Sequence, residues 1–190
     1  MWSFYRLWVL LPALLVLTAC ATGTTLFNGK DLAGWDVTGE ADWQVRGSEL
    51  VASGEGDGYL VSGEEFQDFR LSLEFWVDAT TNSGVFIRCR DRGDISAETC
   101  FELNIWDQHP MQEARTGAIV LKVMPPLVQV ETVGRWNTYD VTAKGTNLVV
   151  KVNGVITAIM VRADPAGGFI ALQHFGKGTI RFRNIRLGTG

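Results

Sequence analysis

The residues best suited to acid–base chemistry lie near the middle of the chain, in the segment Phe101–Asp107. Glu102 and Asn104 alternate there, so on a strand their side chains emerge on the same face. Arg88 ends the preceding apolar segment and reaches that face as well if a hairpin pairs it with Glu102. A carboxylate beside a guanidinium can act as a base next to an anion-stabilising group. The same pair is also a common structural ion pair.

Four further polar side chains are candidates because they lie at the ends of apolar segments. Asp107 and His109 follow the Glu102 segment, where a loop could reach a ligand, although a solvated loop residue is an adequate description of His109. Gln173 and His174 end another apolar segment near the C-terminus. Successive side chains on a strand point to opposite faces, so His174 cannot be assumed to take the role of a residue at the neighbouring position 175.

Two tryptophans, Trp76 and Trp106, fall on the expected polar faces of their strands. An aromatic ring there suits either sugar stacking or ordinary packing. Other site chemistries find no support, since the sequence has no Gly-x-Ser-x-Gly, no Gly-x-x-x-x-Gly-Lys and no His-Glu-x-x-His. The acidic glycine run 54–58 is better explained as a turn than as a calcium loop, because calcium takes six to eight oxygen ligands.

The cysteines favour an exported protein with one disulfide. Cys89 and Cys100 lack the spacing of a zinc site, so pairing is expected in an oxidising compartment, closing a loop of about ten residues. Two buried free thiols are the alternative. Direct pairing of the two cysteines requires a different register from Arg88 opposite Glu102, unless a bulge reconciles the two.

The elements that position these residues are strands. Apolar residues alternate from Phe69 to Val77, which predicts one core face and one face open to solvent or ligand. Further strands are expected at Trp43–Arg46, Glu49–Ala52, Val85–Cys89, Cys100–Asp107, Ala118–Val123, Trp136–Val141, Asn147–Val152, Val155–Val161, Phe169–Gln173 and Ile180–Leu187.

Turn chemistry supports the strand pattern. Asn153-Gly154 predicts a tight hairpin, because its turn needs positive φ at both positions. The alternation slips at Asn184, which a β-bulge would explain. Twenty-one glycines among many short strands indicate a sandwich or a barrel.

The first twenty residues predict export and lipidation. Arg6 is followed by an apolar run of eleven residues, Leu7–Leu17, which is too short to span a bilayer and typical of a signal peptide. The segment 17–20 resembles the bacterial lipobox, with Cys20 as the lipidated residue; an ordinary signal peptide or a chance cysteine is the alternative. We therefore expect a signal peptide at 1–19, a lipidated cysteine and tether at 20–25, and one domain at 26–190. A membrane anchor is the first expected partner, and because Ala21 follows the cysteine, such lipoproteins favour the outer membrane facing the periplasm.

Net charge argues against nucleic acid as a partner. The formal charge is −4 for the precursor and becomes −5 when Arg6 is removed with the leader. Phosphate contacts need clustered Lys and Arg side chains. The positive residues near the C-terminus are explained by a solvated strand face.

A series of short motifs resembles the 3-keto-disaccharide hydrolase family, in the family's order and across residues 26–187. The Asn-Ser-Gly turn at 82–84 leads into a strand that ends in Arg88, and 101–107 resembles the family's Tyr-Glu-x-Gln-x-x-Asp strand. The other fragments are Leu26-Phe27-Asn28-Gly29-Lys30-Asp31-Leu32 with Gly34-Trp35, Asp68-Phe69-Arg70-Leu71, Thr116-Gly117-Ala118-Ile119, Trp136-Asn137, Asn153-Gly154, Gly168 with Leu172-Gln173, and Phe182-Arg183-Asn184-Ile185.

The resemblance implies an all-β, antiparallel two-sheet jelly-roll sandwich of the concanavalin A-like type. It implies cleavage of 3-keto-glycosides, in which the ketone acidifies the proton at sugar carbon 2 and a base removes it. Such a site needs a base, an enolate-stabilising donor or divalent metal, and an acid for the leaving oxygen. The ligand expected is therefore a carbohydrate, and no cofactor is required with certainty.

Within this resemblance, the expected catalytic residues are Glu102, Arg88 and His174, and the expected substrate contacts are Asn104, Asp107, Gln173, Trp106 and Trp76. The chain departs from the family in three places: Phe175 stands at the usual histidine position, His174 at the usual acidic position, and Asn104 at the usual glutamine. The alternative function is a carbohydrate-binding or scaffolding lipoprotein without catalysis.

Overall fold

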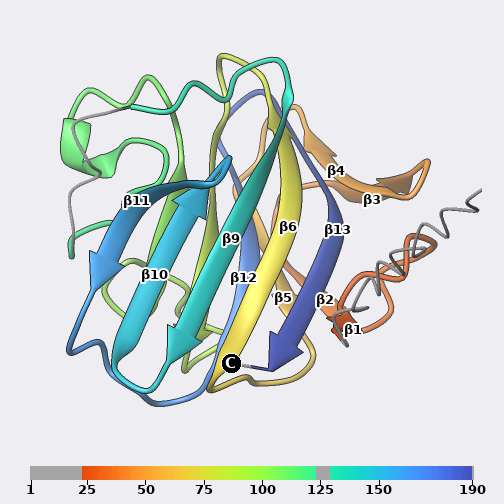
Figure 1. Cartoon of the computed structure of the whole chain (residues 1–190). Helices are drawn as coiled ribbons and strands as arrows, with labels where there is room; N and C mark the ends of the chain where they lie inside the picture. The colour runs from red at the N-terminus through yellow and green to blue at the C-terminus, as the bar shows by residue number, and fades with distance from the viewer. Residues whose placement is uncertain (1–22, 123–128, 190) are drawn as a thin grey trace, which may run out of the picture.

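The computed structural model describes residues 23–122 and 129–189. The expected leader and the expected lipidation at Cys20 lie outside the described residues. The described segments form thirteen strands and a single short 3₁₀ helix, Gln112–Ala114. The chain is therefore all-β, and its strands form two antiparallel sheets that pack face to face (Figure 1).

The larger sheet has eight strands, and its centre is formed by β6 and β13, which pair along most of their length (Figure 1). In spatial order the sheet contains β11 (Val155–Met160), β10 (Asn147–Val152), β9 (Trp136–Lys144), β6 (Phe69–Val77), β13 (Thr179–Thr189), β4 (Glu49–Ser53) and β3 (Trp43–Arg46), with β1 (Thr24–Thr25) pairing β13.

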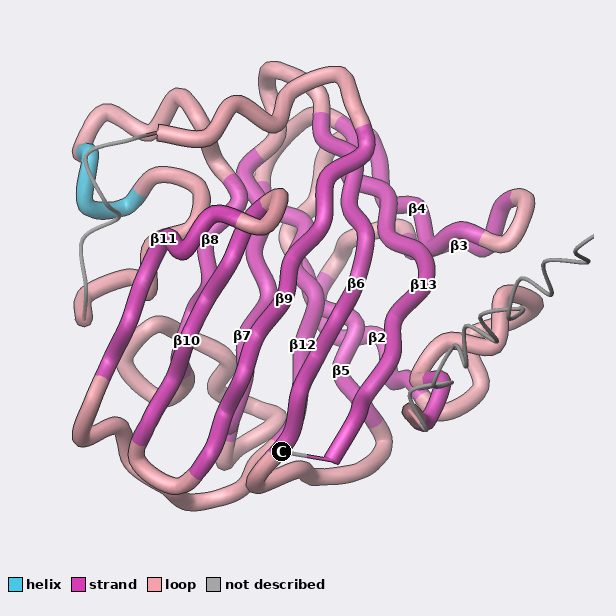
Figure 2. The backbone as a smooth tube through the Cα atoms, in the orientation of Figure 1, coloured by secondary structure: helices cyan, strands magenta, loops and turns pink. Residues whose placement is uncertain are grey.

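The smaller sheet lies behind the larger one in the orientation of Figure 2. It has five strands in the order β2 (Trp35–Gly39), β5 (Gly58–Ser62), β12 (Phe169–Phe175), β7 (Asn82–Cys89) and β8 (Phe101–Ile105). The expected jelly-roll sandwich is thus confirmed, and β8 is an edge strand of this sheet.

The core fills the space between the sheets, as the period-two pattern predicts. Alternate residues of β6 from Phe69 to Val77 are buried against apolar residues of the smaller sheet, such as Leu103 and Leu172. One hydrogen bond crosses the core, because the buried Tyr139 hydroxyl donates to the carbonyl of Asn104 at 3.0 Å. Burial of this inner face fixes which side chains of β8 must point outward.

The strand predictions differ from the structure in several places. Ala118–Val123 is not a strand in its described part; only a single bridge from Ile119 to Leu103 occurs there. The strand expected at 100–107 is shorter, ending at Ile105. The strands β2 and β5 have no counterpart among the expected ones, because each has only five residues and β5 is buried on both faces, which removes the alternation.

The expected turns are present. Asn153 and Gly154 have φ of 51° and 78° between β10 and β11. The register of β13 against β6 shifts between Arg183 and Arg186, with Asn184 at φ 53°, which confirms the expected bulge.

The Cys89–Cys100 disulfide is present, with Cα atoms 4.5 Å apart. The sequence left open how Cys89 could pair with Cys100 in one register with Glu102, and a bulge in β7 answers this. Phe86 and Cys89 are three residues apart on β7, but their partners on β12, Ala171 and Phe169, are only two apart, and Arg88 has φ 56°. The extra residue places Cys89 on the same face as Phe86, from which it can reach Cys100.

Candidate functional site

The outward side of the smaller sheet gathers several of the expected site residues. We call it the Glu102 face and define it by Glu102, Asn104, Phe86, Gly84, Ala171, Gln173, Tyr59 and Val61. Two cross-strand rows make up its floor. Glu102 lies opposite Phe86, which lies opposite Ala171, and Asn104 lies opposite Gly84, which lies opposite Gln173. Gln173 in turn lies opposite Tyr59 of β5.

Glu102 is the chemically most distinctive group of this face. Its side chain is only partly exposed, and burial raises the pKa of its carboxyl to about 7, with a smaller contribution from the nearby negative charge of Glu98. Among residues 23–122 and 129–189, no hydrogen bond or ion pair reaches this carboxylate. A carboxyl group with a pKa near neutrality can both accept and return a proton at physiological pH.

Gln173 lies one row away, and its amide is incompletely bonded. The side chain is 6% exposed, and its buried Oε1 has no hydrogen-bond partner within the described structure. Its Nε2 is 3.5 Å from the Tyr59 hydroxyl, the outer limit of a hydrogen bond. A buried acceptor without a partner costs about 1–3 kcal/mol, so a hydroxyl that reached this oxygen would gain a hydrogen bond that the protein itself does not supply.

Tyr59 is a residue that the sequence analysis missed. Burial raises the pKa of its phenol, so the hydroxyl keeps its proton and can donate. Its ring meets Phe86 edge to face at 5.4 Å between centroids, which fixes its position over the floor. Tyr59 follows Gly58 at the start of a five-residue strand that is buried on both faces, so it gives no periodic signal, and only its cross-strand position beside Gln173 reveals it.

The disulfide loop covers one end of the Glu102 face. Ile95 and the two cysteines pack with Phe86 and Ala171 in a small apolar cluster separate from the main core. Beside this loop, a cleft of about 390 Å³ opens against Tyr59, with Thr38, Asp57, Arg92 and Asp94 among its lining residues. The loop thus covers part of the floor, and the cleft borders the floor at Tyr59.

Asn104 and Asp107 are engaged by the protein itself. Asn104 is 3% exposed; its amide donates to the carbonyl of Ala114, and its oxygen accepts from the Ile105 N–H at 3.0 Å. The Asp107 carboxylate accepts from the hydroxyls of Thr116 and Thr132 at 2.6 and 2.8 Å. Both side chains hold the loop after β8 in place; Asn104 is buried, whereas Asp107 is partly exposed and borders a cleft with Gln108 and Gln129.

Arg88 does not lie opposite Glu102, so the expected carboxylate–guanidinium pair is not formed. The bulge directs the Arg88 side chain away, and it is 2% exposed. Its guanidinium donates to the carbonyls of Gln67, Gly145 and Asp164, at 2.7–3.3 Å, and it lies 3.5 Å from the Asp68 carboxylate. Arg88 therefore joins three loops at one end of the sandwich.

His174 and Phe175, at the end of β12, point to opposite sides of the smaller sheet. His174 is 1% exposed, and its ring nitrogens lie 2.8 and 3.2 Å from the carbonyl oxygens of Gly56 and Gly178. It is adjacent to Gln173 on the strand and points to the other side. Phe175 returns to the Glu102 face and is 42% exposed. His174 accordingly does not substitute for a histidine at position 175.

The two tryptophans are not brought together. Trp76 lies in the larger sheet, on the opposite side of the sandwich from Glu102, with Arg181 stacked over its ring. Trp106 follows β8 directly, and its ring meets His109 edge to face at 4.4 Å. Only Trp106 is close enough in the chain to border the Glu102 face.

We searched the described residues for side chains that could bind a divalent metal ion. Nowhere in the described part of the chain do three or more His, Cys, Asp or Glu side chains converge in a way that could hold an ion. In the same described segments, no helix is long and apolar enough to cross a membrane.

Comparison with known proteins agrees with this fold and extends it. The model of one family, described as a 3-keto-alpha-glucoside-1,2-lyase-like domain, matches residues 22–188. A search of the curated proteins returns no match.

Solved structures give a consistent picture of the architecture. A candidate glycosyl hydrolase from Parabacteroides distasonis ATCC 8503 is similar with a TM-score of 0.78 and 26% identity, covering 88% of this chain and 99% of the other. A second candidate glycosyl hydrolase from the same organism has a TM-score of 0.76 and 21% identity, covering 88% and 94%. The carbohydrate-binding module CBM66 from Bacillus subtilis has a TM-score of 0.59 and 14% identity, covering 82% and 96%, and so shares the fold.

Proposed function

Because this chain belongs to the family of 3-keto-alpha-glucoside-1,2-lyase-like domains, we propose that it binds glycosides oxidised to a ketone at sugar carbon 3 and cleaves them on the Glu102 face. The observation that carries the proposal is Glu102 itself. Its carboxyl has a pKa raised to about 7 and lies one row from the unpartnered oxygen of Gln173. Strand spacing puts the Cα atoms of these residues roughly 12 Å apart, so their side chains can approach one sugar ring from two sides.

The reaction follows from the acidity of the carbon next to the ketone. Glu102 removes the proton at sugar carbon 2, and the C–H electron pair forms the enolate of the carbon 3 ketone. The enolate then expels the glycosidic oxygen from carbon 1, leaving a double bond between carbons 1 and 2. The leaving oxygen takes up a proton, for which the newly protonated Glu102 is the available acid. Water added across the double bond completes hydrolysis.

The neighbours of Glu102 supply binding and charge stabilisation. The Tyr59 hydroxyl is a donor suited to the developing enolate oxygen, because it retains its proton. The Gln173 Oε1 accepts from a sugar hydroxyl and so gains the partner that it lacks. The half-covered floor raises the strength of these interactions by excluding water.

The test is turnover of a defined substrate by the purified protein. With 3-keto-trehalose, we expect release of a sugar from the wild type and a loss of about 10²–10⁴ in kcat/KM for Glu102→Gln. The matched control is Glu98→Gln, an exposed carboxylate whose charge contributes to the raised pKa of Glu102. This control should remain active, and the rise of its kcat/KM with pH should move to lower pH. Wild-type levels of turnover in Glu102→Gln would exclude Glu102 as the base.

A second function, carbohydrate binding without catalysis, is favoured by one observation. Phe175 places an exposed ring on the Glu102 face where the family usually has histidine. A module of this kind would bind a sugar equally well in the wild type and in Glu102→Gln, and would release no product from either. The combination of binding and no turnover distinguishes it from the enzyme.

We also propose that the chain is a lipoprotein of the bacterial envelope. The support is the sequence alone: an eleven-residue apolar core followed by the lipobox-like segment ending in Cys20. Acylation of Cys20 would tether the sandwich through residues 21–25, with the outer membrane, facing the periplasm, as the proposed location.

A further inference from the structure

The outward side of the larger sheet carries a second cluster of aromatic and charged residues. We call it the Trp76 face, and it comprises Trp76, Trp136, Arg181, Arg183, Glu49 and Glu74. Trp136 of β9 lies directly opposite Trp76 of β6, which lies opposite Arg181 of β13. In the next row Glu74 lies opposite Arg183. The cluster thus occupies adjacent positions on neighbouring strands at the centre of the sheet.

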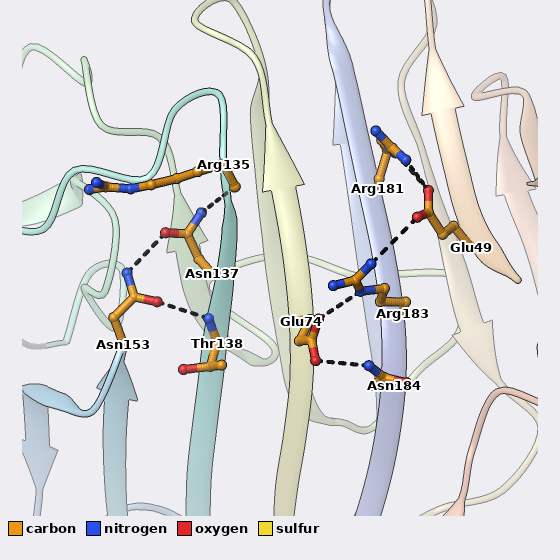
Figure 3. Close-up of polar contacts among 9 residues, drawn as sticks. All are labelled: Glu49, Glu74, Arg135, Asn137, Thr138, Asn153, Arg181, Arg183 and Asn184. Carbon is orange, nitrogen blue, oxygen red and sulfur yellow. Dashed lines mark hydrogen bonds and ion pairs between the residues drawn. The ribbon is translucent and has the colours of Figure 1, made fainter. Parts of the chain in front are cut away.

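A hydrogen-bonded lattice fixes the charged groups of the Trp76 face (Figure 3). Arg181 Nε donates to Glu49 Oε2 at 2.7 Å, and Arg183 Nε donates to Glu74 Oε2 at 2.6 Å. Asn184, at the bulge of β13, donates to Glu74 Oε1 at 2.8 Å. Glu49 also lies 3.8 Å from Arg183, so it links the two arginines.

The arginines also stack on the tryptophans. The guanidinium carbon of Arg183 lies 3.8 Å from the centroid of the Trp136 ring, and that of Arg181 lies 5.2 Å from the same centroid. Such contacts are favourable and orient both partners. Because the side chains stand on paired central strands and not on loops, their geometry is set before any ligand arrives.

The Trp76 face remains open to solvent despite this order. Both arginine side chains are 35% exposed, and both tryptophans are partly exposed. Within the described residues Arg183 makes its hydrogen bond through Nε, and Nη1 faces Glu49 at 3.8 Å, so N–H groups of the two terminal nitrogens can still donate to a ligand. Two carboxylates balance two guanidiniums, which leaves the face close to neutral.

From these properties we infer that the Trp76 face is a binding site for an uncharged saccharide. A sugar ring offers hydroxyls that both donate and accept, around an apolar C–H surface. Paired arginines and carboxylates complement the hydroxyls, and the indole rings complement the C–H surface. An anionic ligand would meet Glu49 and Glu74, and a cationic one would meet the arginines.

The Trp76 face contributes too little to the stability of the fold for stability alone to explain it. Partly exposed ion pairs contribute about 0–1 kcal/mol each. The core of β6 and β13 is on the other side of the sheet, where Phe75 and Phe182 are completely buried. Elsewhere on the same outward side, β6 and β9 present Ser72 and Thr142. On the outward sides of β6 and β9, aromatic side chains occur only in the Trp76 face.

This inference does not depend on the proposed function, because the two sites lie on opposite outer sides of the sandwich. The test is isothermal titration calorimetry of the purified protein with unoxidised neutral oligosaccharides, maltohexaose and cellohexaose, and with trehalose. We expect at least one of them to bind the wild type, and Arg183→Ala and Trp136→Ala to weaken binding tenfold or more. Arg186→Ala is the matched control, since this arginine is exposed on the same strand beyond the bulge and makes no ion pair within the described residues.

Two further variants are measured in the same titrations. Arg183→Lys keeps the charge and the fold but loses the planar stack on Trp136, so it should also weaken binding. Glu102→Gln should bind these unoxidised sugars like the wild type. Absence of binding by every neutral sugar would overturn the inference, as would binding that is lost in Glu102→Gln and retained in folded Arg183→Ala.

Discussion

At the scale of single residues, the Glu102 face depends on one carboxyl group that the fold desolvates. Glu102 lies on the outward side of β8 and is partly exposed, and it stands opposite Phe86, which packs with the disulfide loop. The resulting pKa of about 7 is useful for proton transfer and unfavourable for stability. Such a trade-off between activity and stability is common at functional sites, and its effect on the free energy of unfolding can be measured.

The unfolding free energy of Glu102→Gln should exceed that of the wild type at pH 8 and equal it at pH 4. The unfolded carboxyl ionises near its ordinary value of 4.5, whereas the folded one ionises near 7, so stability falls as pH rises between these values. The full shift corresponds to about 3 kcal/mol, and partial exposure reduces it to about 1–3 kcal/mol. Urea unfolding at several pH values measures the difference. A pH-independent difference would show that Glu102 is not desolvated.

At the scale of elements, the loops at one end of the sandwich are joined by Arg88. A β-bulge at this residue both turns its side chain toward three loop carbonyls and brings Cys89 to the face where Cys100 lies. The family's strand ending in arginine therefore has a structural explanation in this chain. The disulfide then clamps the loop that borders the Glu102 face.

Arg88→Met should destabilise the protein by about 3–5 kcal/mol. Its removal leaves the carbonyls of Gln67, Gly145 and Asp164 without their donor, and buried polar groups without partners are costly. Arg70→Met is the matched control, because Arg70 is exposed on β6 and should change stability by less than about 0.5 kcal/mol. Equal urea midpoints for Arg88→Met and the wild type would contradict this account.

At the scale of the whole molecule, the sandwich presents two outer faces of different chemistry. The Glu102 face has a single proton-transfer group beside an unpartnered amide, and the Trp76 face has a neutral lattice of stacked and paired side chains. Separation by the core makes the two faces independently testable. A tether at the N-terminus would hold both near a membrane surface.

Lipidation is checked by growing bacteria that express the full chain with labelled palmitate. The wild type should incorporate label and sediment with membranes, since two or more acyl chains make anchoring effectively stable. Cys20→Ser should remain unlabelled and soluble with an unchanged melting temperature. Failure of the wild type to take up label would refute the anchor.

The period-two pattern of segments such as Phe69–Val77 was enough to predict an all-β sandwich or barrel, because alternation of burial is a local property of the chain, and the family resemblance predicted the two-sheet form. The sequence also indicated the Asn153-Gly154 turn, the bulge at Asn184 and the Cys89–Cys100 pairing, each of which follows from backbone or thiol chemistry. The family motifs singled out Glu102 and Gln173, and the structure places both on one face.

The surroundings of each polar side chain, by contrast, depended on tertiary contacts. A one-residue bulge turned Arg88 from Glu102 toward three loops, and the loop after β8 occupied Asn104 and Asp107 with internal hydrogen bonds. Tyr59 joined Gln173, and Trp76 joined Trp136, through pairing of strands distant in the chain. Such contacts depend on register and burial, which sequence spacing does not encode because a slip of one residue exchanges the two faces of a sheet.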